Sequence, residues 1–233
     1  MDFKADIGII GALDDEVRAI IAALDDRRTE CVGGIEFNLG FIAGKRVAVA
    51  RCGVGKVFAA MCAEAMIVKY SPALVVNTGV GGALDRRLDA CDIVLASRLI
   101  QYDMDTTAFG DPLGMISGIN KVYFETDGRA LSLLCEIAEG MGLHCLVGTV
   151  ATADRFVSSA SEKLSLGERF GASACEMEGG AIAHVAFVNR TPCMVIRAIS
   201  DCVEGEASMD YEHFLPIAVK NSVALTMALI ERY

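Results

Sequence analysis

Residues 174–201 read ACEMEGGAIAHVAFVNRTPCMVIRAISD, and this stretch decides how the rest of the chain is interpreted. Its last block, 194–201, is short, apolar and β-branched, and it follows Pro192. Such a composition is typical of a buried strand and is too short for a separate helix. The apolar run before the proline, up to Val188, has the length of a helix.

Charged residues interrupt this predicted buried strand. Arg197 lies in its middle and Asp201 ends it. A guanidinium is costly to bury unless carboxylates meet it. Glu176 and Glu178, about twenty residues upstream and followed by two glycines, are the candidates for that contact.

The composition indicates a globular chain and argues against several kinds of partner. With 233 residues and 53% hydrophobic content, we expect a single domain spanning residues 1–233. The net charge is −10 without a lysine–arginine cluster, so we expect no nucleic acid and no membrane as partner. No run approaches the roughly 20 apolar residues that span a bilayer. The acidic start does not resemble a signal peptide.

The nine cysteines and three histidines do not form a metal-binding pattern. No C-x-x-C pair occurs, and His144, His184 and His213 are scattered along the chain. Zinc sites need clustered ligands, so we expect no metal. Neither a P-loop nor a dinucleotide-binding glycine motif is complete, and we expect no cofactor. The cysteines fit buried thiols in a reducing cytosol, which predicts a cytoplasmic protein.

Segments with strand-like and helix-like patterns alternate along the chain. We predict strands at about 7–12, 35–42, 45–51, 74–77, 92–96, 145–150 and 194–201, and helices at about 14–24, 56–69, 127–141, 161–170, 181–188 and 211–231. This alternation predicts one three-layer α/β/α domain with a mixed, mostly parallel central sheet.

Candidate site residues fall where the predicted strands end. Ligands in such folds bind beyond the carboxyl ends of strands, and Glu16, a glycine-rich turn at 78–82 and Asp201 fall there, with Phe156 in a nearby loop. Such a turn lets the backbone approach a ligand closely, although a plain tight turn is the alternative. Glu16 has the alternative of an ordinary acid favoured by the helix dipole.

Residues 101–123 form a long irregular stretch that carries several apolar side chains. Loops of this length in a compact domain are usually lids, interfaces or disordered segments. The apolar side chains here have no obvious partner within the chain, which favours a homodimer.

Six short motifs occur in order along nearly the whole chain. They are IIGA (9–12) with DDEV (14–17), GVGK (53–56), NTG (77–79), TAFG (107–110), EME (176–178) and RAISD (197–201). Together they resemble the 5′-methylthioadenosine/S-adenosylhomocysteine nucleosidase family, within the nucleoside phosphorylase superfamily. The resemblance implies a nucleoside phosphorylase-like domain that hydrolyses the bond between adenine and a 5′-thio-substituted ribose.

The resemblance also implies a role for each matched residue. Glu16 matches the acid that activates water, Asp201 the group that protonates N7 of adenine, and Glu178 the carboxylate that holds the ribose hydroxyls. By the same resemblance Phe156 stacks on adenine, the Val157 backbone reads the base edge, Ser200 steadies Asp201, and Leu13, Val54, Met177, Tyr211 and Phe214 line the sugar and alkylthio pocket. Thr106 and Phe109 match residues that reach across a homodimer interface into the neighbouring site.

The chemistry of N-glycoside cleavage favours these residue types independently. Leaving adenine must be neutralised by an acid that holds a proton, and Asp201 ends an apolar strand, where burial favours an uncharged carboxyl. The ribose becomes oxocarbenium-like, so nearby carboxylates stabilise the developing positive charge. Arg197 is expected to neutralise surplus carboxylates and to help hold the water. A structural ion pair with Glu178 or Glu16 is compatible with that role.

Three positions depart from the family's usual pattern. The residue after 77–79 is usually a serine and is Val80 here, so a hydroxyl that contacts water or ribose is lost. Water placement then depends more on the charged residues. Leu13 and Thr106 also differ from the commonest residues of the alkylthio pocket, which leaves the preferred 5′ substituent open.

Other functions stay open on the sequence. A purine nucleoside phosphorylase needs phosphate ligands, whereas the turn after the first strand is acidic and Val80 lacks a hydroxyl, so water is the preferred nucleophile. A hydrolase of a futalosine-type nucleoside uses the same chemistry on a different substituent. A non-catalytic nucleoside-binding protein has no need for Glu16, Glu178 and Asp201 together.

Overall fold

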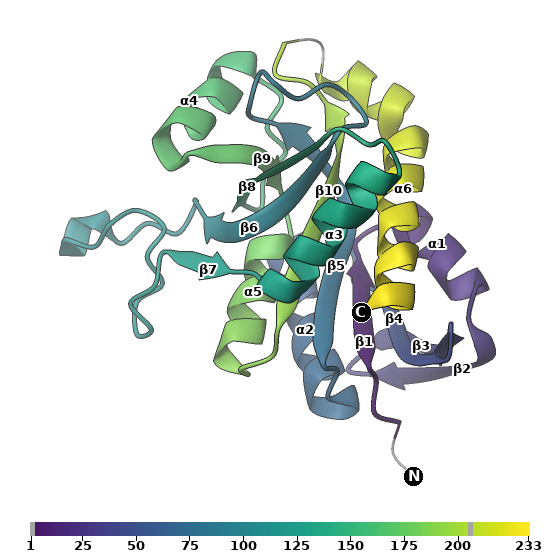
Figure 1. The fold of residues 1–233 in the computed structure, drawn as a ribbon. Helices are drawn as coiled ribbons and strands as arrows, with labels where there is room; N and C mark the ends of the chain where they lie inside the picture. Colours follow the sequence, from purple (N-terminus) through teal and green to yellow (C-terminus); the bar gives the residue numbers. More distant parts are fainter. Residues whose placement is uncertain (1–2, 205–206) are drawn as a thin grey trace.

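The computed structural model describes residues 3–204 and 207–233, and their strands and helices alternate as predicted (Figure 1). The strands are β1 (Ile7–Gly11), β2 (Asp25–Val32), β3 (Ile35–Ile42), β4 (Lys45–Arg51), β5 (Leu74–Ala83), β6 (Ile93–Gln101), β7 (Tyr123–Glu125), β8 (Cys145–Thr152), β9 (Ala172–Glu176) and β10 (Cys193–Asp201). The helices are α1 (Asp14–Ala22), α2 (Lys56–Tyr70), the short η1 (Thr107–Phe109), α3 (Gly128–Gly140), α4 (Ala160–Phe170), α5 (Gly179–Val188) and α6 (Ala207–Arg232).

All ten strands belong to one mixed sheet with the order β10-β6-β8-β9-β5-β1-β4-β3-β2, and β7 pairs with β6. Because β10 also pairs with β5, the strands β10, β6, β8, β9 and β5 close into a ring. The α/β class is confirmed, but the sheet is more mixed than predicted: five strand pairs are parallel and five antiparallel within the described residues.

The central strands are buried on both faces, which explains their continuous apolar sequences. Successive side chains of a strand point to opposite faces. Ile10 therefore belongs to a core shared with Met66 of α2 and Ile182 of α5, whereas Ile9 belongs to a second core shared with helices α1, α3 and α6. Helices cover the sheet on both faces, and this confirms the layered arrangement (Figure 1).

The predicted glycine-rich turn at 78–82 is wrong, because β5 continues as a strand to Ala83. This extension pairs with β10 up to Asp201 and with β9 through Gly82 and Ala83. Strands β2, β7 and β9 were not expected from the sequence. β2 has a mostly exposed, charged composition, and β7 and β9 are short, so none shows a strong apolar pattern.

Helix α6 contradicts the expectation that no segment of the chain is long and apolar enough to span a bilayer. Within the described residues, the segment His213–Arg232 is long and apolar enough, by length and composition, to cross a bilayer. In the fold, Ala218, Leu225 and Leu229 of this helix are buried in the core shared with β5 and β10. The protein core thus accounts for the apolar character of α6.

The stretch between β6 and β7 projects from the body of the molecule (Figure 1). It contains η1, which has no buried residue, and Phe109 is 89% exposed. This long irregular segment was predicted from the sequence, but the expectation that its apolar side chains have no partner within the chain is wrong, because Leu113 and Ile116 pack against the core of the same chain.

Candidate active site

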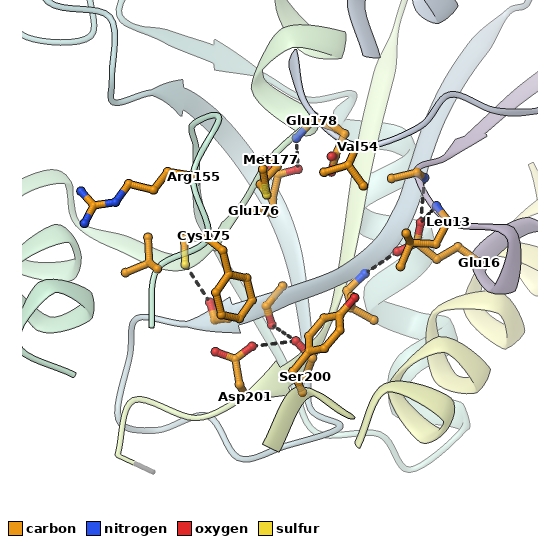
Figure 2. A pocket seen from close by; sticks show the side chains of 17 residues that line it. Leu13, Glu16, Val54, Arg155, Cys175, Glu176, Met177, Glu178, Ser200 and Asp201 are labelled. Atoms are coloured by element: carbon orange, nitrogen blue, oxygen red, sulfur yellow. Dashed lines mark hydrogen bonds between the residues drawn. The ribbon is translucent and has the colours of Figure 1, made fainter. Parts of the chain in front are cut away.

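A cavity of about 280 Å³ lies where the segments after β1, β4 and β8 meet the ends of β5, β9 and β10 (Figure 2). Most of the residues predicted for the site line it. They are Leu13, Glu16, Val54, Val80, Phe156, Val157, Met177, Glu178, Ser200, Asp201 and Tyr211. The cavity wall also includes Gly81 and Gly82 of the predicted glycine-rich segment, and four residues that sequence reasoning did not assign to it, namely Ala12, Arg155, Cys175 and Glu176.

Four of the predicted site residues do not line this cavity. Arg197 lies behind it and is 1% exposed. Phe214 of α6 is outside the lining and contacts the ring of His213. Thr106 and Phe109 lie on the projecting segment around η1. Their predicted contact with the active site of a neighbouring subunit stays a prediction.

Glu16 is a buried carboxylate, not an ordinary exposed acid of a first helical turn. Its side chain is folded back over the start of α1, where one oxygen accepts hydrogen bonds from the backbone N–H of Ala12 (2.7 Å) and Leu13 (2.9 Å). Its other oxygen accepts from the Val80 N–H at 3.1 Å. Burial raises the pKa of Glu16, although these hydrogen bonds and the charge of Arg197 oppose the shift.

Glycines in β5 make room for the carboxylates. A Cβ atom on Gly79 would lie 2.5 Å from Oε1 of Glu16, and one on Gly82 would lie 2.9 Å from Oδ2 of Asp201. Real Cβ atoms do not approach polar atoms that closely. The glycine-rich sequence therefore allows two acids to pack directly against a strand, and its role is close approach rather than a turn.

Arg197 forms its ion pair with Glu176, not with Glu178 or Glu16. The Nη2 group donates to Oε2 of Glu176 and to Oδ1 of Asn77, and Nη1 donates to the Ile196 carbonyl at 2.9 Å. Burial would raise the pKa of Glu176, but the charge of Arg197 and several hydrogen bonds hold this pKa below its usual range. This pair joins β10, β9 and β5 behind the cavity.

Glu178 faces the cavity from the start of α5 (Figure 2). Its Oε1 accepts a hydrogen bond from the Gly55 N–H at 2.8 Å. Burial and the nearby charge of Glu176 raise the pKa of Glu178 to about 7. Within the described residues no lysine, arginine or histidine forms an ion pair with Glu178 or with Glu16. Both carboxyls thus face the cavity without a direct ion-pair partner among these residues.

Asp201 ends β10 on a different side of the cavity from Glu16 (Figure 2). Its Oδ1 accepts a hydrogen bond from the Ser200 hydroxyl at 2.7 Å, as the predicted steadying role requires. Its Oδ2 accepts from Nζ of Lys163 at 2.5 Å, in an ion pair whose two side chains are 1% and 2% exposed.

Lys163 is the charged neighbour that sequence reasoning missed. It lies on α4 at helical spacing with Leu166 and Phe170, and all three are buried. The sequence contained a signal for its burial: Lys163 shares a helix face with two apolar residues, whereas surface helices place lysine on the opposite face. The prediction treated this helix only as a connection.

An aromatic and apolar wall completes the cavity. Phe156, in the loop before α4, is half-exposed and contacts the ring of Tyr211 edge-on, with ring centroids 5.9 Å apart. Val157 beside it is buried. A flat, partly exposed aromatic face next to polar groups suits a planar base. No cluster of metal-binding side chains occurs in the part of the chain that the structure describes.

Comparisons with known proteins identify the family of the chain. The model of a family described as the phosphorylase superfamily matches residues 6–231. A 5′-methylthioadenosine/S-adenosylhomocysteine nucleosidase of Staphylococcus haemolyticus is 34% identical, over 97% of this chain and 99% of that protein. An aminodeoxyfutalosine nucleosidase of Campylobacter jejuni is 31% identical, over 97% and 98% of the two chains.

Solved structures of similar proteins share the fold. A 5′-methylthioadenosine/S-adenosylhomocysteine nucleosidase of Neisseria meningitidis, in complex with methylthio-immucillin-A, has a TM-score of 0.93 and 29% identity, with 97% of this chain and 99% of that chain covered. A futalosine hydrolase of Helicobacter pylori has a TM-score of 0.93 and 32% identity, with coverage of 100% and 99%.

The raised pKa of Glu178 makes stability pH-dependent. Between its ordinary value of 4.5 and about 7, the folded protein binds this proton more tightly than the unfolded chain does. The free energy of unfolding therefore falls as the pH rises through this window. In Glu178→Gln the bond from Gly55 is kept but no charge forms. Urea titrations should show that the wild type loses roughly 1–3 kcal/mol relative to this variant across the window. A constant difference would contradict the shift.

The ion pair of Arg197 predicts a large effect on stability. Arg197→Met leaves Glu176 buried without its cation, and we expect the free energy of unfolding to fall by about 3–5 kcal/mol. The double variant Arg197→Met, Glu176→Gln removes both charges and should recover part of this loss. Arg232→Met, which breaks an exposed pair with Glu136, should cost less than about 1 kcal/mol. Similar losses in the buried and exposed variants, measured by urea denaturation, would refute the assignment.

Proposed function

Because the chain belongs to the phosphorylase superfamily, and within it to the family of 5′-methylthioadenosine/S-adenosylhomocysteine nucleosidases, we propose that it hydrolyses the N-glycosidic bond of these two nucleosides. The products are adenine and a 5-thio-substituted ribose, and 5′-deoxyadenosine is a further expected substrate. The observation that carries the proposal is that Glu16, Glu178 and Asp201 reach one cavity from three separate segments.

In the proposed reaction Asp201 acts as the general acid. Adenine leaves as a neutral molecule only if a ring nitrogen gains a proton, and a positioned carboxyl supplies it. Asp201 lines the cavity and is oriented by Ser200. Phe156 and the Val157 backbone, beside it in the cavity wall, supply the aromatic face and the polar edge for the base.

Glu16 and Glu178 act on the ribose side. As the glycosidic bond breaks, positive charge develops on the sugar ring, and preformed negative charge nearby stabilises it. These two carboxyls are the ones without an ion-pair partner among the described residues. We assign water activation to Glu16 and the binding of the ribose hydroxyls to Glu178. Arg197 supports both indirectly by holding Glu176.

Water is the nucleophile that this cavity favours over phosphate. The described lining contains four carboxyl groups and one guanidinium, Arg155, which is ion-paired with Glu162 at 2.8 Å. A phosphate dianion near Glu16 would meet like charge instead of the cations that bind it. This electrostatic balance disfavours the phosphorylase alternative.

A futalosine-type nucleoside is the second candidate substrate. The similar proteins from Campylobacter jejuni and Helicobacter pylori carry that activity in their names. The 5′ end of the cavity has the apolar residues Leu13, Val54 and Tyr211, which favour an alkylthio group. Turnover rates for a panel of nucleosides with different 5′ substituents rank the two candidates.

We further propose that the protein is a homodimer. Val57, Met61 and Val68 form an exposed apolar stripe on α2, and Phe187 and Val188 extend it on the adjacent α5. A groove of about 380 Å³ runs between these helices. A second copy of the chain is the expected occupant, because Phe109 and Thr106 on the projecting segment need a neighbouring cavity to reach.

Adenine release from methylthioadenosine, followed with and without phosphate, tests the proposed function. We expect equal rates in both conditions. Release that requires phosphate would establish the phosphorylase alternative, and tight binding without release would establish a nucleoside-binding protein.

The same assay examines the assigned residues. Asp201→Asn and Glu16→Gln should each lower kcat by about 10²–10⁴-fold, while a non-hydrolysable analogue binds nearly as before. Asp14→Asn is the matched control, because Asp14 is an exposed acid two residues from Glu16 that pairs with Arg18. Equal loss of turnover and analogue binding would mean that the acids are structural.

Sedimentation velocity tests the dimer. Val57→Asp places a charge in the apolar stripe, and we expect a monomer that has lost most of its activity. Val147→Asp changes an exposed valine of β8 outside this face and should leave the dimer intact. A wild-type monomer with full activity would refute the assignment of Thr106 and Phe109.

A further inference from the structure

One buried cation next to the cavity has no place in the mechanism above. Nζ of Lys163 donates to Oδ2 of Asp201 at 2.5 Å and to the Cys202 carbonyl at 2.6 Å, and the side chain is 1% exposed. Lysine is rarely buried so completely. Removing an ammonium and a carboxylate from water is costly even when they pair. A pair buried at this cost beside Asp201 calls for a role in the function of that acid.

The contacts hold Asp201 from opposite sides. Lys163 binds Oδ2, the Ser200 hydroxyl binds Oδ1, and Gly82 leaves space for the carboxylate against β5. Lys163 itself does not line the cavity, so it acts on substrate only through Asp201. A hydroxyl or an amide could also hold Oδ2. An ammonium differs from both because it carries a proton that it can give up.

Lys163 also links the base-binding loop to the acid. Helix α4 begins three residues after Val157, and Lys163 lies in its first turn. Phe156 and Val157 therefore directly precede the helix whose Lys163 binds Asp201. A base that packs against this loop contacts the segment that leads into that helix.

We propose that Lys163 is the positioning residue for Asp201 and the source of the proton that Asp201 delivers to the base; this inference rests on the proposed function. The proton moves from Nζ to the carboxylate, and both charges disappear. The carboxyl then transfers the proton to the base nitrogen as the glycosidic bond breaks and its electron pair goes to the base. Nζ, left as an amine, regains a proton from solvent, and the attacking water releases one, so protons balance over the cycle.

Two substitutions separate positioning from proton supply. Lys163→Met removes both, whereas Lys163→Arg keeps the positive charge but introduces a guanidinium that does not lose its proton in proteins. We expect each to lower kcat for adenine release by about 100-fold or more, with KM within about threefold. Lys45→Met, on β4 away from the cavity, is the control with wild-type rates. Wild-type kcat in Lys163→Arg would overturn proton supply.

A kinetic double-mutant cycle excludes a general structural effect. Because Lys163 acts through Asp201, adding Lys163→Met to Asp201→Asn should lower the residual rate by less than about threefold. If Lys163→Met lowered kcat by the same factor in the wild type and in Asp201→Asn, the proposal would be overturned. The double variant also buries no unpaired charge, so comparing its rate with that of Asp201→Asn tests whether Lys163 acts through Asp201 even if Lys163→Met alone does not fold. If the wild type itself releases no adenine, the proposed function fails and this inference fails with it; normal wild-type release with an unaffected Lys163→Met overturns only the inference.

Discussion

The burial of four carboxyl groups around the end of one strand is the constraint on which the rest of this structure depends. Glu16, Glu176, Glu178 and Asp201 all line the cavity beside β5 and are at most 7% exposed. Such a concentration of acid in an apolar fold is unstable unless each group is paired, hydrogen-bonded or protonated. The fold uses all three solutions, and each leaves its carboxyl suited to a different task.

Cations and backbone groups divide these acids into two classes. Arg197 and Lys163 pair with Glu176 and Asp201, whereas Glu16 is held by backbone N–H groups. The contact from position 80 to Glu16 comes from the backbone, so the loss of the usual serine at Val80 does not remove it. Glu16 therefore keeps its orientation with a valine at this position, and only a side-chain hydroxyl is missing from the cavity wall.

The sequence predicted the α/β class, most of the central strands and most of the cavity wall, because these follow from apolar periodicity and ordered motifs. It could not predict the closed ring of strands, since β10 pairs with both β5 and β6 and pairing partners leave no local pattern. The glycines at 79–82 were interpreted as a turn because their close neighbours, Glu16 and Asp201, are distant in sequence. The sequence also could not decide which glutamate pairs with Arg197. Glu176 and Glu178 are two residues apart, and only the strand-to-helix transition between them shows which side chain faces Arg197.

That transition also explains why two neighbouring glutamates have opposite properties. Glu176 ends β9, accepts the N–H groups of Glu178 and Gly179, and faces Arg197. Glu178 begins α5, faces the cavity, and lies close enough to Glu176 for its pKa to rise while that of Glu176 falls. The permanent charge of Glu176 thus both anchors Arg197 and adjusts Glu178. Positive charge near Glu178 would offset this repulsion, because a cation favours the ionised carboxylate. The charge of Glu178 therefore depends on Glu176, an acid whose own bonds are structural.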